Sequence, residues 1–336
     1  MKADSILLSH GSGGIESQNL ITEFFLPFLK DCVISSGEDA GIGTCDSKHF
    51  AISTDGYVVS PIFFPGGDIG KLSVCGSCND VAMMGAKAKY LSASFMIEEG
   101  FLISDLQKII ESFANTLKLS GTKLISADTK VLPKGALDKI FITTTAFGEF
   151  LYPHLNLSAF KIPADSAIIV SGNIGTHGAV IYSKRDGIDL QSDLKSDCAL
   201  LYPLLEPLFK EKIPLFCMRD ATRGGIASVL NEWANASNIG IIIEEDSLPI
   251  LEQVKGICEL LGFSAYNLAN EGMCVLCVEK SEAQNALEIL KKGGAKDAAI
   301  IGYTTQEHKK SVILQTSFNA KRYLEYPSGE LLPRIC

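Results

Sequence analysis

Strand-like and helix-like stretches of hydrophobic residues are mixed along the whole chain. A period of two predicts strands, and a period near 3.6 predicts helices. In the first half the predicted elements are strands at residues 50–54, 90–97, 123–127 and 139–147 and a helix at residues 67–85. This mixture is typical of a sheet covered by helices.

One further helix has clear ends. Ser104 is a suitable N-cap, and Gln107, three residues later, completes a capping box. Gly121 suits the position just after the last turn, where a left-handed conformation is common. The apolar residues between these ends fall on one stripe: Leu106, Ile109, Ile110, Phe113, Ala114 and Leu117. We therefore expect an amphipathic helix with one buried face.

The pattern breaks between residues 150 and 166, where prolines and polar residues cluster. After the break, strands are predicted at residues 167–171, 239–244, 273–278 and 296–301, and helices at residues 222–236, 252–261 and 281–292. We predict an α+β fold of two α/β-layered domains, residues 1–155 and 156–324. Residues 325–336 contain two prolines and a glycine and are predicted to be an extended, mobile tail.

Composition narrows the class of protein. The chain has 336 residues, 46% hydrophobic and 21% charged, which is typical of a folded protein with two domains. Its formal net charge of −9 argues against a nucleic-acid partner, although magnesium and backbone N–H groups can still bind ATP. No apolar run is long enough to cross a bilayer, and the first residues lack a secretory signal. We expect a cytoplasmic location and no membrane partner.

The ten cysteines are more typical of core packing than of a disulfide scaffold in such a chain. Cys274 and Cys277 lie in a predicted strand, where side chains three residues apart point to opposite faces. Cys75 and Cys78 share a face of a predicted helix. Core packing is the favoured interpretation of this pair, and a metal or redox role is the alternative.

The glycine-rich segments do not match a known nucleotide-binding loop. Residues 66–72 fail the Walker pattern, and residues 172–178 lack the dinucleotide spacing and are predicted to turn into a helix. Residues 9–14, which include Gly13 and Gly14, form a Gly/Ser loop that can cradle phosphate with backbone N–H groups. A disordered terminus is the equal alternative.

Three aspartates are candidate magnesium ligands. Asp55 and Asp128 each end a predicted strand, and Asp80 lies in the first predicted helix. If they converge, they can hold Mg²⁺ against a triphosphate, because this ion prefers carboxylates, waters and phosphate oxygens. The alternative is that each caps or turns its own segment. Lys130 can offer charge to a phosphate or tune a nearby base.

The second half has two weaker signals. Arg219 and Arg223 precede a predicted helix, and helix N–H groups together with guanidinium groups suit an anion. Glu271, which follows Asn270 just before a predicted strand, can act as a general base if a partner tunes its pKa.

Cys336 is the last residue of the predicted tail, so we expect its thiol to be exposed, unlike the other nine. Its own carboxylate disfavours the thiolate, and Arg334 favours it. A thiol on a tether can accept a group at one site and deliver it at another. A carrier function is therefore a better explanation of a cysteine at this position than a chance occurrence.

Taken in chain order, these segments resemble the HypE family of hydrogenase maturation factors. The similar segments are residues 10–14, 54–72, 75–76, 79–80, 128–131, 219–225, 269–272 and the ending Pro-Arg-Ile-Cys at 333–336. The likeness runs from residue 9 to the last residue. The family belongs to the superfamily of aminoimidazole ribonucleotide synthetase (PurM), selenophosphate synthetase and thiamine monophosphate kinase, in which the terminal motif is highly specific.

The resemblance implies two PurM-like domains, a homodimer whose N-terminal domains share a sheet or barrel, and ATP bound mainly on the N-terminal domain. It implies that HypF carbamoylates the Cys336 thiol and that ATP drives dehydration of the thiocarboxamide to a thiocyanate. The cyano group then passes to iron on HypC–HypD for nickel–iron hydrogenase. Glu271, paired with Lys130, is expected to deprotonate the nitrogen. The expected ATP ligands are Gly13, Gly14, Asp55, Asn79, Asp80, Asp128, Arg223 and Asn270, with Mg²⁺ on the three aspartates.

Two positions depart from the family pattern and affect local loop geometry. Ala127 stands where a glycine often occurs, and Met273 stands where lysine is common. Two other functions remain open at this point. One is a small-molecule kinase or amidine-forming synthetase of the same superfamily, and the other is a non-catalytic scaffold for metallocluster assembly.

Overall fold

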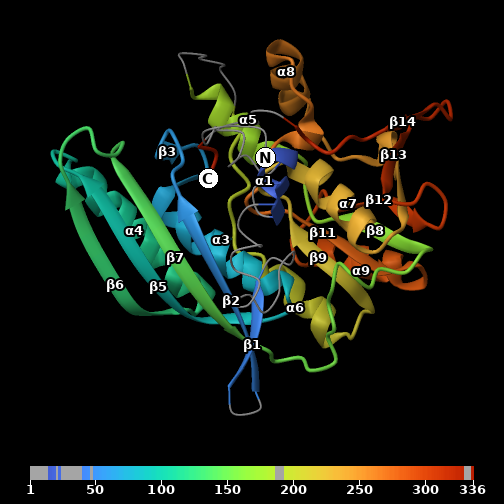
Figure 1. Ribbon diagram of the computed structural model, residues 1–336, viewed down its shortest axis with the longest axis horizontal. Coiled ribbons are helices and arrows are strands. Elements are labelled where there is room, and N and C mark those ends of the chain that lie inside the picture. The colour runs from blue at the N-terminus through green and yellow to red at the C-terminus, as the bar shows by residue number, and fades with distance from the viewer. Residues whose placement is uncertain (1–13, 20–21, 24–39, 46–47, 186–192, 329–333) are drawn as a thin grey trace.

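Two sheets stand side by side in the computed structural model, one from each half of the chain, with helix α3 (Ile69–Met83) between them (Figure 1). The structure describes residues 14–19, 22–23, 40–45, 48–185, 193–328 and 334–336. α1 (Ile15–Asn19) and the described end of the chain both lie near the middle of the molecule (Figure 1).

The first sheet has five strands in the order β1-β2-β7-β5-β6. β5 and β6 are parallel, and the other neighbouring pairs are antiparallel. Its strands are β1 (Gly41–Cys45), β2 (Lys48–Tyr57), β5 (Lys87–Glu98), β6 (Lys123–Leu132) and β7 (Ile140–Glu149). A separate two-stranded sheet, β3 (Phe63–Phe64) and β4 (Gly67–Asp68), leads into α3.

The helices cover one face of this sheet. α3 packs against β2, β7 and α4 (Ile103–Ser120). Along β7, buried residues such as Ile140 and Ile142 alternate with half-buried ones, so the opposite face is less covered. β6 lies at the edge, and its residues 123–131 are all exposed. Sheets normally pair or cover such an edge strand.

The second sheet has seven strands in the order β14-β13-β10-β12-β8-β11-β9. They are β8 (Ser166–Val170), β9 (Leu215–Asp220), β10 (Gly240–Glu244), β11 (Cys274–Glu279), β12 (Ala299–Thr305), β13 (Ser311–Gln315) and β14 (Lys321–Tyr323). The helices of this half are α5 (Thr176–Ser183), α6 (Tyr202–Lys210), α7 (Gly225–Ala236), α8 (Glu252–Leu261) and α9 (Ala283–Lys292).

Central strands of the second sheet are buried on both faces. Cys277 on β11 packs with Trp233 of α7, whereas Cys274 packs on the other side with Phe209 of α6 and Leu290 of α9. This confirms that the two cysteines point to opposite faces. A strand with two buried faces is a continuous apolar run rather than an alternating one.

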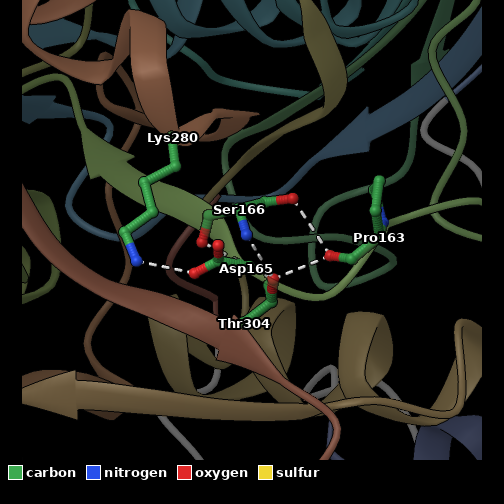
Figure 2. Close-up of polar contacts among 5 residues, drawn as sticks. All are labelled: Pro163, Asp165, Ser166, Lys280 and Thr304. Carbon is green, nitrogen blue, oxygen red and sulfur yellow. Dashed lines mark hydrogen bonds and ion pairs between the residues drawn. The ribbon is translucent and has the colours of Figure 1, made fainter.

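A polar cluster fixes the point where the chain enters the second sheet (Figure 2). Thr304 Oγ1 of β12 donates to Pro163 O at 2.7 Å and accepts from Ser166 N at 2.9 Å. Lys280 Nζ lies 2.6 Å from Asp165 Oδ1. These contacts anchor the chain at the first residue of β8, directly after the proline-containing break in the sequence pattern.

The end of α3 joins the two sheets. Ala82 and Met83 pack with Leu205 and Phe209 of α6 in the core of the second half. Because both ends of this junction are apolar and buried, the two sheets are held in a defined relative position.

The predicted strands and helices are all present, with differences at their ends. α4 begins at Ile103, with Leu102 as an N-cap that makes no side-chain bond, so the Ser104 capping box is wrong. The Leu102 carbonyl already accepts two amide N–H groups, which places Ser104 inside the first turn. Gly121, at φ 71°, confirms the predicted helix end.

Two aspartates lie inside strands rather than at their ends. β2 continues past Asp55 to Tyr57, and β6 continues past Asp128 to Leu132. The strand-end prediction is wrong because pairing with β7 and with β5 extends each strand beyond its apolar run. The sequence pattern also gave no prediction for α6, which contains Pro207, or for the edge strand β9.

None of the helices that the structure describes is both long and apolar enough to cross a bilayer.

Candidate active site

The last three residues of the chain lie docked along residues 58–60. Val58 N donates to Cys336 O at 2.9 Å, and Ser60 N donates to Arg334 O at 3.1 Å. In return, Arg334 Nε donates to Val58 O at 2.8 Å. The predicted exposure of Cys336 is therefore wrong, because these contacts leave the residue only half-exposed.

Side chains from the second half hold the same segment. His177 Nε2 lies 2.8 Å from Ile335 O, and the Ile335 side chain is buried in the core. Arg185 donates from Nη2 to Arg334 O and from Nε to Ser60 O, the latter at 2.7 Å. The end of the chain is thus bound by backbone groups on one side and by side chains on the other.

Burial raises the pKa of the Cys336 thiol to about 12. Arg223 opposes this rise, whereas Glu271, Asp55 and Asp220 add to it. Arg223 was a predicted anion ligand, and its pKa is raised first by Cys336 and then by Asp55 and Glu271. Three acidic side chains and one guanidinium group therefore act in opposite directions on the pKa of the docked thiol.

From the sequence, Arg334, rather than Arg223, was predicted to favour the thiolate. Arg334 instead pairs with Asp138, with 2.5 Å between Nη1 and Oδ2. Its Nε also donates to Val58 O, so both ends of its guanidinium group are bound to residues of the first half. Arg334 reaches Asp138 because the tail is docked, and the sequence could not indicate this docking.

Glu271 is a buried acid with an unsatisfied oxygen. It is only 2% exposed, and its Oε1 has no hydrogen-bond partner among the described residues. Burial, followed by the charges of Cys198, Asp220, Asp197 and Asp55, raises the pKa of this carboxyl group well above its ordinary value of 4.5. Such a group holds its proton through the acidic range and is suited to proton transfer.

This raised pKa has a consequence for stability. Between pH 4.5 and the higher pKa, the folded chain binds more protons at Glu271 than the unfolded chain does. Stability therefore falls as the pH rises through this window. We expect Glu271→Gln to be more stable than the wild type at pH 7 and to lose that advantage near pH 4. Urea unfolding at both values measures it, and an equal difference at both would contradict the assignment.

The backbone around Glu271 is held by side chains that the sequence predicted as ATP ligands. Asn270 Oδ1 accepts from Gly175 N at 2.7 Å, and its Nδ2 donates to Asp197 Oδ2 at 2.8 Å. Asn79 Nδ2 donates to Ala199 O at 2.9 Å. Both amides are buried and bind protein groups, so they position the loop, and their contact with ATP stays a prediction.

Asp55 and Asp80 lie between β2 and α3. Tyr57 donates from its hydroxyl to Asp55 Oδ2 at 3.3 Å, and Ser53 donates to Asp80 Oδ2 at 2.5 Å. Ser53 and Asp55 point to the same face of β2, and both carboxylates, after burial, raise the pKa of Tyr57. Two of the three predicted magnesium ligands are thus brought together.

Asp128 is not brought to them within one chain. Asp55 lies opposite Thr144, Thr144 opposite Ala93, and Ala93 opposite Ala127, so these four residues share a face. Asp128, the next residue on β6, points to the other face. β6 is also three strand positions from β2, which is about 14 Å.

Lys130 does not reach Glu271 within one chain either. It is exposed on β6, and its Nζ lies 2.8 Å from Asp128 Oδ2. Glu271 is buried in the second half of the chain, and its Oε1 has no hydrogen-bond partner among the described residues. The predicted Lys130–Glu271 pair is therefore absent from a single chain.

The remaining predicted residues contribute less. Gly13 lies outside the described residues, and Gly14 abuts the tail, where an added Cβ would come 2.6 Å from Pro327 O. Cys75 and Cys78 are buried and unpaired by disulfide, as core packing predicts. Among the residues described, no group of three acidic, histidine or cysteine side chains is arranged to hold a metal.

Sequence reasoning missed three residues of this site: His177, Asp197 and Asp220. Asp220 lies within the block that was predicted to bind an anion, so its position was available as a signal. His177 lies in the first turn of α5, in a segment that was predicted only to turn into a helix, and Asp197 lies in an irregular segment, so neither had such a signal.

Comparison with known proteins identifies the family. The model of the N-terminal domain of AIR synthase related proteins matches residues 37–150, and that of the C-terminal domain matches residues 164–315. Carbamoyl dehydratase HypE of Escherichia coli is 41% identical over 340 residues, which cover 99% of this chain and 100% of that protein. The chain belongs to the HypE family.

Solved HypE structures have the same fold. In the HypE–HypF complex, the matched chain has a TM-score of 0.84 and 40% identity, covering 92% of this chain and 99% of its own. A HypE in complex with ATP has a TM-score of 0.82 and 37% identity, covering 99% and 100%. The predicted α+β fold of two domains of the AIR synthase related type and the resemblance to the HypE family are confirmed.

Proposed function

We propose that this HypE-family chain carries a carbamoyl group on the Cys336 thiol and uses ATP to dehydrate it to a thiocyanate. The cyano group would then pass to iron on HypC–HypD, as a ligand for nickel–iron hydrogenase. One observation carries the proposal: the backbone of Cys336 is hydrogen-bonded to Val58, directly after the strand that contains Asp55. A kinase or synthetase that acts on a free small molecule would not require a cysteine docked at this position, so that alternative is disfavoured.

The reaction has two requirements. The carbamoyl oxygen must become a leaving group, which transfer of the γ-phosphoryl group of ATP provides. Both N–H protons must also leave, so that the C–O bond breaks, phosphate departs and a C≡N bond forms on the sulfur. The first requirement needs charge around phosphate, and the second needs a base beside the nitrogen.

Glu271 is the proposed base. Its unsatisfied Oε1 is buried close enough to Cys336 to alter the pKa of that thiol. Burial raises the pKa of this carboxyl group and favours its protonated form, so the group must ionise before it can accept a proton. A cation brought near it would lower its pKa, and this is the role we assign to Lys130.

Asp55 and Asp80 fit a magnesium ion in part. Mg²⁺ is usually held by one or two protein carboxylates together with phosphate oxygens and waters. These two side chains lie on one side of β2, and both remain partly exposed. When bound, the ion would neutralise charge on the triphosphate of ATP. Asp128 is the proposed third ligand, and Arg223 would add a positive charge.

A second copy of the chain is the proposed source of Asp128 and Lys130. Both lie on β6, the edge strand whose residues 123–131 are exposed on both faces. Ile125, 65% exposed, and Val131, 68% exposed, would be buried in a homodimer. Burying apolar side chains and pairing an open edge are both favourable.

Mixing two inactive variants tests this shared site. We expect Lys130→Ala and Glu271→Gln each to dehydrate poorly alone. If Lys130 acts across the dimer, one site of every mixed dimer has both residues intact. Random subunit exchange makes half of the dimers mixed, so about a quarter of the wild-type rate should return. A mixture as inactive as its two parents would contradict the shared site.

HypF is the proposed donor of the carbamoyl group, and the solved HypE–HypF complex of a relative supports this partner. While docked, the Cys336 thiol has a pKa of about 12 and is therefore a poor nucleophile near neutral pH. We propose that the tail is released for loading and docks again for dehydration. These steps would take place in the cytoplasm.

A further inference from the structure

A chain of buried hydrogen bonds runs from an irregular segment to the docked tail. Ile335 O can only accept, so the proton of the neutral His177 ring must be on Nε2. Nδ1 then accepts from Ser196 Oγ at 2.7 Å. Ser196 Oγ in turn accepts from Cys198 N at 3.1 Å. His177 is fully buried, so both of its nitrogens depend on these partners.

Asp197, the residue after Ser196, binds the backbone of the loop that contains Glu271. Asp197 accepts from Glu271 N at 3.2 Å and from Gly272 N at 3.0 Å. An added Cβ on Gly272 would come 1.8 Å from Asp197 O, so the two segments are in close contact. Directly after this segment, Ala199 O accepts from Asn79 Nδ2 of α3 at 2.9 Å.

We infer that His177 and residues 196–198 form a latch that positions the Cys336 thiol against Glu271. Ser196 orients the ring that holds the tail, and Asp197 holds the backbone of the base. Adjacent residues thus set the position of both reacting groups, and such alignment strongly affects rate. His177 and Asp197 are positioning residues in this account. The inference rests on the proposed function only in assuming that Cys336 carries the reacting group.

His177 favours the docked tail because its partner belongs to the tail. In His177→Leu, docking would bury Ile335 O without a donor, which is unfavourable. His177→Gln places an amide N–H near the position of Nε2 and should restore the bond. The two variants therefore separate loss of the hydrogen bond from loss of the ring.

Alkylation of Cys336 by iodoacetamide measures tail release in the full, unloaded chain. The docked thiol is half-buried with a raised pKa, so alkylation requires release. We expect His177→Leu to react about tenfold faster than the wild type, equivalent to about 1.4 kcal/mol, and His177→Gln to react at close to the wild-type rate. The C-terminal peptide is quantified by mass. Alkylation does not involve ATP, so its result is independent of whether the chain dehydrates a carbamoyl group.

Cys277, fully buried in the second sheet, is the internal control. A wild-type rate at Cys336 in His177→Leu, with Cys277 still protected, would overturn the latch. If Cys277 also becomes reactive, Ser196→Ala replaces that variant, because it keeps the His177 ring and removes the hydroxyl group that binds Nδ1 and Cys198 N. Faster alkylation of Cys336 in Ser196→Ala supports the latch, and an unchanged rate overturns it.

Discussion

Replacing Cys336 with serine is expected to abolish carbamoyl loading completely and, with it, formation of thiocyanate. The hydroxyl group that replaces the thiol is far less acidic and less nucleophilic. Docking should survive, because the contacts of the tail are made by the backbone of residues 334–336 and by the Arg334 and Ile335 side chains. Loading by HypF with carbamoyl phosphate and ATP, followed by mass analysis of the C-terminal peptide, measures the loss.

Cys258→Ala is the matched control. Cys258 is a buried cysteine of α8 and belongs to no part of the proposed site. This variant should load fully once its folding has been verified by circular dichroism. Loading of Cys336→Ser at the wild-type level would show that another residue accepts the carbamoyl group.

Glu271→Gln is expected to slow dehydration by about a hundredfold to ten-thousandfold and to leave loading unchanged. Glutamine has the shape of the protonated carboxyl group that the raised pKa favours, so the fold should be preserved. It cannot accept a proton, and the N–H protons of the thiocarboxamide would have no base. The measurement is a single turnover of chain that has been carbamoylated beforehand, followed after addition of Mg-ATP.

Glu206→Gln supplies the comparison for this experiment. Glu206 lies on α6 and pairs with Lys210 at the surface, with 2.8 Å between Oε2 and Nζ. Loss of an exposed pair has little effect on stability, so this variant should dehydrate at the wild-type rate. Equal rates in the two variants would remove Glu271 from the mechanism.

Local patterns along the chain were sufficient to predict most of the fold. The buried strands and the amphipathic helices have periods that the sequence displays directly, and Gly121 marks a true helix end. Strand order is different, because it depends on contacts between distant segments. The sequence could not indicate that β6 is an edge strand parallel to β5, and this placement separates Asp128 from Asp55.

The candidate site was predicted by residue type but not by arrangement. Glu271, Arg223 and Cys336 do converge, although they are far apart in the sequence. The tail was expected to be exposed because its own residues cannot form a helix, yet its partners, such as His177 and Val58, lie far from it in the sequence. Asn79 was predicted to bind ATP, but an amide of this kind can equally bind backbone groups, and only the fold decides between them.

The central claim is that Cys336 carries the group that is dehydrated. The most direct test follows the mass of the C-terminal peptide while the full chain is incubated with HypF, carbamoyl phosphate and ATP. The account predicts that one carbamoyl group is added to Cys336 and that the adduct then loses one water as ATP is consumed. An unmodified Cys336 throughout ATP hydrolysis, or a carbamoyl adduct that never loses water, would contradict it.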